Sequence, residues 1–280
     1  MSEEKQLFGL ELINKVIEIV LWTGWVKNAE KPVSLLTIAP PEEGKTRLVE
    51  QYRYNKGIVY ITDVTAYGLS QKLIQYINEG KPVNHIIIPD LLNPLSRQKS
   101  VSDTFILFLN ALIEEGIAKI KTGSILMEIP MKAGVITTLT TSEWYKHKDK
   151  WISIGFLSRL VPLTYRYSRN FIMELLEQLS GAEPIKTEIN LNFPEEKVHV
   201  TLPRELHRQL KPYAIDIAKV VGLDGIRMYR DLGIMLKGFA LSQGRDYVTQ
   251  GDVDVLKYLT NYINYDFNLI DLGMPKFPYK

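Results

Sequence analysis

The sequence predicts an α/β fold, in which helices flank a parallel β-sheet that is followed by a small helical domain. Short apolar runs rich in β-branched residues, typical of buried strands, occur at 33–39, 58–64, 85–88 and 133–141. Segments in which apolar residues recur at helical spacing separate these runs, as the connections of a parallel sheet require. From residue 203 onward the pattern is helical.

The composition is typical of a globular protein. The 280 residues are 45% hydrophobic and 24% charged, and the net charge of +2 is too small to indicate a nucleic-acid partner by itself. Because the chain has no cysteine, disulfides and thiolate metal sites are excluded. The longest apolar region, 12–26, contains Asn14, Lys15 and Glu18 and falls short of the ~18 apolar residues of a membrane span. We therefore expect a cytoplasmic protein without membrane contact.

Helices are predicted wherever apolar residues recur three and four positions apart. Gly80 and Gly116 are expected to end two of them, and Thr249 with Asp252 is expected to begin the last one. Residues 124–131 resemble a strand, whereas 182–203 alternate weakly and indicate a linker or a small hairpin. The predicted helices are 7–26, 47–54, 69–80, 100–118, 170–181, 204–222, 226–244 and 249–264.

Residues 39–46 are the stretch from which a phosphate-binding site is predicted. The first strand run is followed by APPEEGKT and then by a helix, which is the context of the phosphate-binding motif G-x-x-x-x-G-K-[ST]. Successive main-chain N–H groups and the helix N-terminus would cradle phosphates there. Lys45 would reach the β- and γ-phosphates, and the Thr46 hydroxyl would bind Mg²⁺. The alternative is a chance EGKT in a surface turn. The loop residues are Ala39, Pro40, Pro41, Glu42, Glu43, Gly44, Lys45 and Thr46.

Ala39 stands where the motif has its first glycine. An alanine fits this position only if its φ angle is negative.

An acidic side chain follows the third strand run. Asp90 comes directly after HIIIP, at the carboxyl end of that strand, where ligands bind in open parallel sheets. A carboxylate there would hold Mg²⁺ through water. The residue after Asp90 is Leu91, so the acid pair of a hydrolytic site is incomplete. Asp90 in a plain turn remains an alternative, and Asp63 and Asp103 are reserve carboxylates.

Hydroxyl side chains end the strand run at 133–141. Thr140 or Thr141 at the tip of a strand between the two preceding ones would hydrogen-bond the γ-phosphate or the attacking water, although threonine is also common in strands for its β-propensity. The histidines His85, His147, His199 and His207 lack metal-ligand spacing, and we expect them to be solvated.

The order of these motifs resembles that of AAA+ ATPases, particularly their MoxR-like and minichromosome-maintenance-helicase branch. Four pieces between Val33 and Asn264 carry the resemblance: APPEEGKT, HIIIPD, GFLSRLVPL and GLDGIRMYRDLGIMLKGFALSQGRDYVTQGDVDVL. The last is the most specific, since its end is similar to the helical lid of MoxR-like proteins. The resemblance implies a nucleotide-binding α/β domain at 1–182, a linker or small hairpin at 183–202 and a helical lid at 203–280 with an irregular C-terminal tail.

The resemblance also implies roles for two arginines. Arg159 would be the arginine finger that reaches the γ-phosphate bound by a neighbouring subunit, with Arg166 and Arg169 as alternatives, and Arg227 would be the sensor-2 arginine. Any of these could instead be a solvated or ion-paired surface residue. The cofactors would be ATP and Mg²⁺. The phosphate loop and Thr140 or Thr141 would contact the phosphates of ATP, and Asp90 would bind Mg²⁺.

A trans arginine implies a homo-oligomer, since head-to-tail contacts close into rings or continue as helices; the family expectation is a hexamer. Three functions stay open at this point: an ATPase that remodels or moves on DNA or a protein complex, a nucleotide-gated assembly subunit, and a scaffold without nucleotide. The incomplete acid pair favours the second, and Ala39 favours the third.

Overall fold

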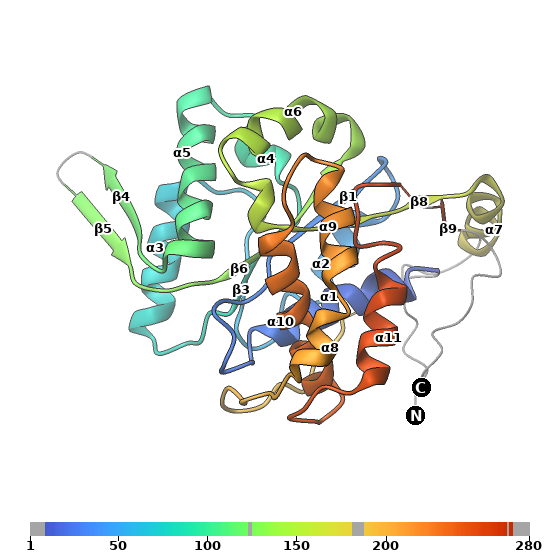
Figure 1. The fold of residues 1–280 in the computed structure, drawn as a ribbon. Helices are drawn as coiled ribbons and strands as arrows, with labels where there is room; N and C mark the ends of the chain where they lie inside the picture. The colour runs from blue at the N-terminus through green and yellow to red at the C-terminus, as the bar shows by residue number, and fades with distance from the viewer. Residues whose placement is uncertain (1–8, 123–124, 181–187, 268, 271–280) are drawn as a thin grey trace.

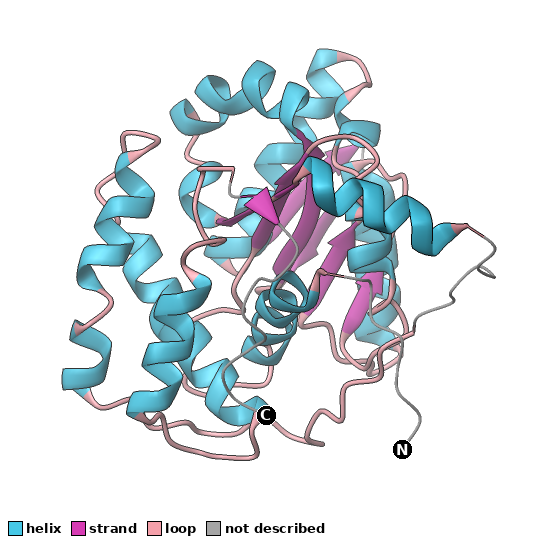
Figure 2. Cartoon of the chain, turned by 90° about the vertical axis from the view of Figure 1, so that its right-hand side faces the viewer, coloured by secondary structure: helices cyan, strands magenta, loops and turns pink. Residues whose placement is uncertain are grey.

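A five-stranded parallel sheet forms the centre of the computed structural model, which describes residues 9–122, 125–180, 188–267 and 269–270 (Figure 1). The strands stand in the order β2-β3-β6-β1-β7. Figure 2 shows them between helices on both sides. The strands are β1 (Leu35–Ala39), β2 (Ile58–Tyr60), β3 (His85–Ile88), β6 (Gly134–Thr140) and β7 (Val161–Thr164).

The strand register fixes what lies at each edge of this sheet. β1 pairs in parallel with β6 on one side and with β7 on the other, and β3 pairs in parallel with β6. Every residue of β1, β3 and β7 is buried, which explains why they read as continuous apolar runs rather than as alternating ones. The predicted parallel sheet with flanking helices is therefore confirmed, and the carboxyl ends of β3, β6 and β1 share one edge.

Helices connect the strands as the parallel order requires. The α-helices of this part are α1 (Glu11–Thr23), α2 (Lys45–Glu50), α3 (Ala66–Asn78), α4 (Leu92–Leu95), α5 (Lys99–Asn110), α6 (Thr141–Ser153) and α7 (Arg169–Leu179). A short 3₁₀ turn, Leu157–Arg159, precedes β7, and the two-residue strands β8 (Arg166–Tyr167) and β9 (Leu269–Ile270) pair in parallel.

The hairpin β4 (Ala118–Thr122) and β5 (Ile125–Ile129) projects from the molecule (Figure 1); β5 confirms the strand predicted at 124–131, whereas β4 was not predicted. The helix predicted at 100–118 ends as an α-helix at Asn110 and continues as one π-helical turn to Glu115. Gly116 then takes a φ of 75°, as expected of a stop. The alternation of buried Ala118 and Ile120 with exposed Lys119 marks the strand that the sequence analysis missed.

The polar segment after β6 forms α6, a helix that was not predicted. Thr140 caps it by accepting a hydrogen bond from the main-chain N–H of Glu143 at 3.4 Å. Of its residues only Trp144 and Trp151 are buried, so its apolar face is too narrow to stand out in the sequence.

Two asparagines hold the linker, of which residues 188–202 are described and 183–187 are not. Asn55 donates to the carbonyl of Ile189 at 2.7 Å and accepts from the N–H of Leu191 at 2.6 Å. Asn28 makes the corresponding pair of bonds to Val200, both 3.0 Å long. Val198 and Thr201 also form single parallel bridges with Val26 and Tyr247, so the described part of the linker pairs with distant segments and forms no hairpin.

His85 is buried rather than solvated, contrary to the prediction. It begins β3, is 1% exposed, and its Nε2 lies 3.2 Å from the carbonyl oxygen of Val33. Burial lowers its pKa to about 3, so the ring is neutral near pH 7.

The C-terminal helices pack against α1 rather than forming a separate core (Figure 1). They are α8 (Arg204–Arg208), α9 (Lys211–Lys219), α10 (Ile226–Ser242) and α11 (Gln250–Leu259). Thr249 and Asp252 form the capping box that begins α11, which confirms the predicted helix start. No described helix is long and apolar enough to cross a bilayer.

The crossing of α1 and α10 depends on Gly238. A Cβ atom there would lie 2.8 Å from the carbonyl oxygen of Ile19 and 3.1 Å from the main-chain nitrogen of Thr23. We expect Gly238→Ala to lower the free energy of unfolding by roughly 1–3 kcal/mol, because the two backbones must move apart. Gly251→Ala in α11 is the matched control, since its Cβ would meet no atom closer than 3.8 Å; it should be neutral or stabilise by up to about 1 kcal/mol. Urea denaturation of both variants checks this, and equal effects would contradict it.

Candidate functional site

The candidate phosphate loop connects β1 to α2 at the carboxyl edge of the sheet. Ala39 is the last residue of β1 and is fully buried beside Thr140 of β6. Gly44 has a φ of 75° and precedes the first residue of α2. Among the described non-glycine residues only Glu42 has a positive φ, 66°. Ala39 therefore meets the condition under which it can replace the first glycine of the motif.

Lys45 is held over this loop. Its side chain is buried, and its ammonium group donates to the main-chain carbonyl of Pro40, five residues earlier. Burial lowers its pKa, while the carboxylates of Glu43 and Asp90 act in the opposite direction. The structure thus brings Lys45 within electrostatic reach of Asp90, which approaches from β3. Thr46, the next residue of α2, is exposed.

Glu43 is a buried acid inside the loop. It is 8% exposed, and its Oε2 has no hydrogen-bond partner among the described residues. Burial raises its pKa to about 7, although a hydrogen bond with the main chain of Tyr167 and the positive charges of Lys45 and Arg166 favour the ionised form. The Tyr165 hydroxyl donates to the main-chain carbonyl of Glu43 at 2.6 Å. Two tyrosines that follow β7 therefore fix the loop on the side of Glu43.

Asp90 is positioned by the neighbouring strand β6. The N–H of Leu91 donates to the carbonyl of Thr138 at 3.1 Å, and the Thr138 hydroxyl donates to the carbonyl of Pro89 at 2.6 Å. These bonds extend the pairing of β3 with β6 past the end of β3. One carboxylate oxygen of Asp90 accepts from the N–H of Leu92 at 2.9 Å, which fixes the side chain in a local turn.

The reserve carboxylates are in ion pairs. Asp63 binds Arg97 through both oxygens at 2.8 and 3.0 Å, and Asp103 binds Lys150. No group of three or more metal-binding side chains occurs among the residues that the structure describes. Thr46 and Asp90 are the oxygen donors that the sequence analysis assigned to Mg²⁺, and both follow strands that end at the carboxyl edge.

The two threonines of the sensor prediction lie at the same edge. β6 stands between β3 and β1, as that prediction requires. Thr140 is the last residue of β6 and Thr141 the first of α6. The Thr140 hydroxyl already accepts the cap hydrogen bond and lies 3.0 Å from the Ser142 hydroxyl, so one hydrogen-bonding position remains for a ligand: the hydroxyl hydrogen if Ser142 donates, or a lone pair if Thr140 does.

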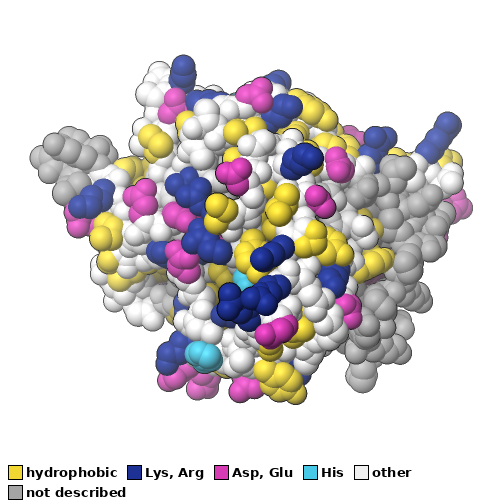
Figure 3. Space-filling model, viewed as in Figure 1, with side chains coloured by type: hydrophobic (Ala, Val, Ile, Leu, Met, Phe, Trp, Pro, Cys, Tyr) yellow, Lys and Arg dark blue, Asp and Glu magenta, His cyan; other side chains and the backbone are white. Residues whose placement is uncertain are grey.

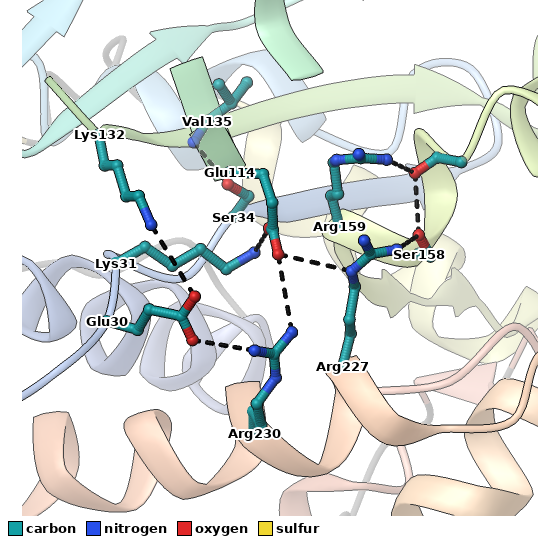
Figure 4. Close-up of polar contacts among 11 residues, drawn as sticks. Glu30, Lys31, Ser34, Glu114, Lys132, Val135, Ser158, Arg159, Arg227 and Arg230 are labelled. Atoms are coloured by element: carbon teal, nitrogen blue, oxygen red, sulfur yellow. Dashed lines mark hydrogen bonds and ion pairs between the residues drawn. The ribbon is translucent and has the colours of Figure 1, made fainter. Parts of the chain in front are cut away.

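Arg159 and Arg227 lie together at the opposite, amino edge of the sheet (Figure 4). Arg227, in the first turn of α10, donates to the Ser158 hydroxyl at 2.7 Å. Arg159 donates to the carbonyl of Gly155, and its Nε is buried without a described partner. Burial and the charge of Arg227 both lower the pKa of Arg159. The two guanidinium groups therefore share one positively charged site.

Glu114 organises this site. Its carboxylate pairs with Lys31, lies 3.5 Å from Nε of Arg227 and lies 3.6 Å from Nη2 of Arg230 (Figure 4). Burial alone would raise its pKa, but Lys31, Arg227 and Arg159 outweigh that effect and hold the pKa below its usual value. Arg230 also binds Glu30 at 2.9 Å. This cluster joins the segment before β1, the π-helical turn and α10.

A pocket of about 340 Å³ opens beside this cluster. Ser158, Asp224, Arg227 and Arg230 line its polar side, and apolar residues of α9, the following turn and the start of α10 line most of the rest. Tyr265 lies in its wall and stacks on Trp144 with ring centroids 5.1 Å apart.

The sequence analysis missed Lys31, Glu114 and Arg230. Their sequence separations, 83 residues between Lys31 and Glu114 for example, leave no local pattern that joins them. The lone signal was the helical spacing of Arg227 and Arg230 at the start of α10.

No protein-family model matches the sequence, and no curated protein is significantly similar to it.

The buried carboxyl of Glu43 should make stability depend on pH. Because its pKa is about 7 in the folded state and about 4.5 when exposed, the unfolded chain loses this proton first, and stability falls as pH rises between those values. We expect Glu43→Gln to raise the free energy of unfolding by roughly 1–3 kcal/mol at pH 8 and by little near pH 4. Denaturation across this pH range is the measurement. The exposed neighbour supplies the control, Glu42→Gln, and a similar pH-dependent gain there would contradict the assignment.

Proposed function

We propose that this protein binds ATP at the carboxyl edge of its sheet and is an oligomeric ATPase of the AAA+ type. One observation carries the proposal: the strand order places Lys45, Asp90 and Thr140 at the carboxyl ends of three adjacent parallel strands. Adjacent strands lie about 4.8 Å apart, so β1 and β3 are separated by roughly 10 Å, a span that a triphosphate can bridge. Ligands of open parallel sheets bind at this edge.

Residues of the loop would bind the nucleotide and would form no covalent bond with it. Lys45 offers an ammonium group that a phosphate oxygen could take over from the carbonyl of Pro40. Mg²⁺, held by Thr46 and Asp90, would neutralise charge that develops on the transferred phosphoryl group. Glu43 hydrogen-bonds with the main chain of Tyr167, and a negative charge on its carboxyl group would oppose that of a triphosphate.

The arginines cannot complete this site within one chain. Lys45 follows the carboxyl end of β1, whereas Arg159 precedes β7 and lies at the amino edge with Arg227. The five residues of β1 alone span roughly 16 Å between the two edges. If Arg159 or Arg227 contacts a γ-phosphate, that phosphate belongs to the loop of a neighbouring copy. This arrangement supports assembly into a ring or helix, with a hexamer as the family expectation.

A nucleotide-gated assembly subunit with little hydrolysis is the second candidate. It is favoured by the Asp90 side chain, which already accepts a main-chain hydrogen bond, and by Leu91 in the place of a second acid. ATP turnover of the purified protein, with and without DNA, separates this candidate from an ATPase that acts on DNA or on a protein complex.

Removal of the Lys45 ammonium group should weaken nucleotide binding. We expect Lys45→Ala to reduce affinity for a slowly hydrolysed ATP analogue roughly 10- to 100-fold, the worth of a hydrogen bond to a charged group. Titration calorimetry with Mg²⁺ present measures it. Lys72→Ala is the matched control, because Lys72 also donates to a main-chain carbonyl, that of Tyr60 at 3.3 Å, but lies on α3. Unchanged affinity in Lys45→Ala would refute the proposed site.

Mixing two inactive variants tests the shared site. Lys45→Ala and Arg159→Ala should each lose ATP turnover, whereas an equal mixture should recover about a quarter of it, because some sites combine an intact loop with an intact arginine from the next copy. Steady-state phosphate release is the measurement. Arg166→Ala and Arg169→Ala are the controls, and each alone should keep its turnover. If one of them loses turnover alone and recovers about a quarter when mixed with Lys45→Ala, while Arg159→Ala stays active alone, the finger is that residue.

A further inference from the structure

Helix α7 exposes an apolar stripe. Ile172, Met173 and Leu176 are 40%, 63% and 58% exposed, and their spacing puts them on one face of the helix. The opposite side is anchored, because Phe171 is buried with its ring 4.6 Å from that of Tyr167. In Figures 1 and 2 the helix stands out from the rest of the fold. A rigidly attached helix with three large exposed apolar side chains is typical of an interaction surface.

This helix lies beside the phosphate loop. The Tyr167 hydroxyl is 3.7 Å from the position that a Cβ atom of Gly44 would occupy, and Tyr165 binds the main chain of Glu43. Tyr167 and Phe171 therefore connect the loop to α7, and any neighbour that covers the loop also approaches the stripe.

The pocket beside Arg227 has the complementary properties. Its apolar lining includes Leu157, Val221 and Leu223, and Ile226 at its rim is 70% exposed. Apolar and basic side chains lie next to each other over this region of α9 and α10 in Figure 3. With about 340 Å³ the pocket can accept branched aliphatic side chains.

The charges of the two surfaces are also complementary. Glu174 and Glu177 border the stripe on α7, and neither forms an ion pair with another residue in the part of the chain that the structure describes. Beside the pocket positive charge is in slight excess: Lys31, Lys132, Arg159, Arg227 and Arg230 outnumber the acids Glu30, Glu114 and Glu115 and Asp224 in the pocket wall by one (Figure 4). Carboxylates that approach this cluster would find guanidinium groups whose charge is incompletely balanced.

We propose that the apolar stripe of α7 docks into the pocket beside Arg227 of a second copy of this chain. The contact is head-to-tail, since the two surfaces differ, and it sets the neighbour's Arg159 and Arg227 next to the phosphate loop that α7 adjoins. In this respect the inference rests on the proposed function and names the surfaces through which the copies assemble.

The absence of natural cysteine allows a direct test by disulfide cross-linking. Met173→Cys protein is mixed with Ile226→Cys protein under mild oxidation, with and without an ATP analogue and Mg²⁺, so that every mixed disulfide joins two chains. We expect the mixed dimer to form on the order of a hundredfold faster than random collision allows, because docking raises the effective thiol concentration to the millimolar range.

Leu107→Cys on α5 is the matched control for Met173→Cys, since Leu107 is 60% exposed and lies on a different face. Its mixture with Ile226→Cys should react at the random rate. Equal rates in the two mixtures, or no mixed dimer in either, would overturn the docking proposal.

A second pair of variants tests assembly without cross-linking. Leu176→Glu should shift the protein to monomer in light scattering while each chain keeps its ATP affinity, and Leu107→Glu should assemble as the unmodified protein does. A Leu176→Glu protein that still assembles would refute the contact. If the cysteine variants do not cross-link but the protein still binds ATP, the docking proposal is wrong and the proposed function stands. If they cross-link but the protein binds no ATP, the proposed function is wrong and the docking stands.

Discussion

The parallel pairing of β6 between β3 and β1 is the constraint on which the rest of the structure depends. Since all these strands run in one direction, their carboxyl ends meet at one edge and the segments that enter them meet at the other. Hydroxyl groups of β6 secure this arrangement: Thr137 donates to the carbonyl of Ile88 and Thr138 to that of Pro89. Asp90 reaches the loop of Lys45 because the ladder continues past the end of β3.

The amino edge is governed by a different interaction, the convergence of basic groups on Glu114. The cationic partners of the half-buried Glu114 carboxylate offset the cost of its desolvation, whereas the same cations without it would repel one another. Arg159 experiences that repulsion from Arg227, which contributes to its lowered pKa. The cluster thus holds Arg227 and Arg230 in place while excess positive charge remains available to an anionic ligand or partner.

Sequence patterns predicted the elements that bury wide apolar faces. The runs that became β1, β3 and β6 and the helix that became α1 were recognised, and so was the Thr249 cap, because a local pattern specifies each of them. Elements that depend on distant partners were missed. The buried state of His85 follows from contacts across the fold, and the Glu114 cluster joins segments far apart in the chain; of the hairpin β4–β5, only β4 was missed. The loop of Lys45 was found because its chemistry is contiguous in sequence.

Under the proposed function ATP turnover requires assembly, because the phosphate loop and the arginines lie at opposite edges of the sheet. A site with Ala39 in place of the motif's first glycine, and with Asp90 but no second acid next to it, provides fewer catalytic groups than a complete site. Transition-state charge must then be stabilised by groups from elsewhere. The two arginines that the resemblance assigns to this role, Arg159 and Arg227, are separated from the loop by the length of the sheet, whereas the alternative Arg166 lies near Glu43. In a head-to-tail assembly the arginines of one copy lie beside the loop of the next, so every site is complete except the one at an open end. Closure into a ring would leave no such end, and activity would then depend steeply on protein concentration.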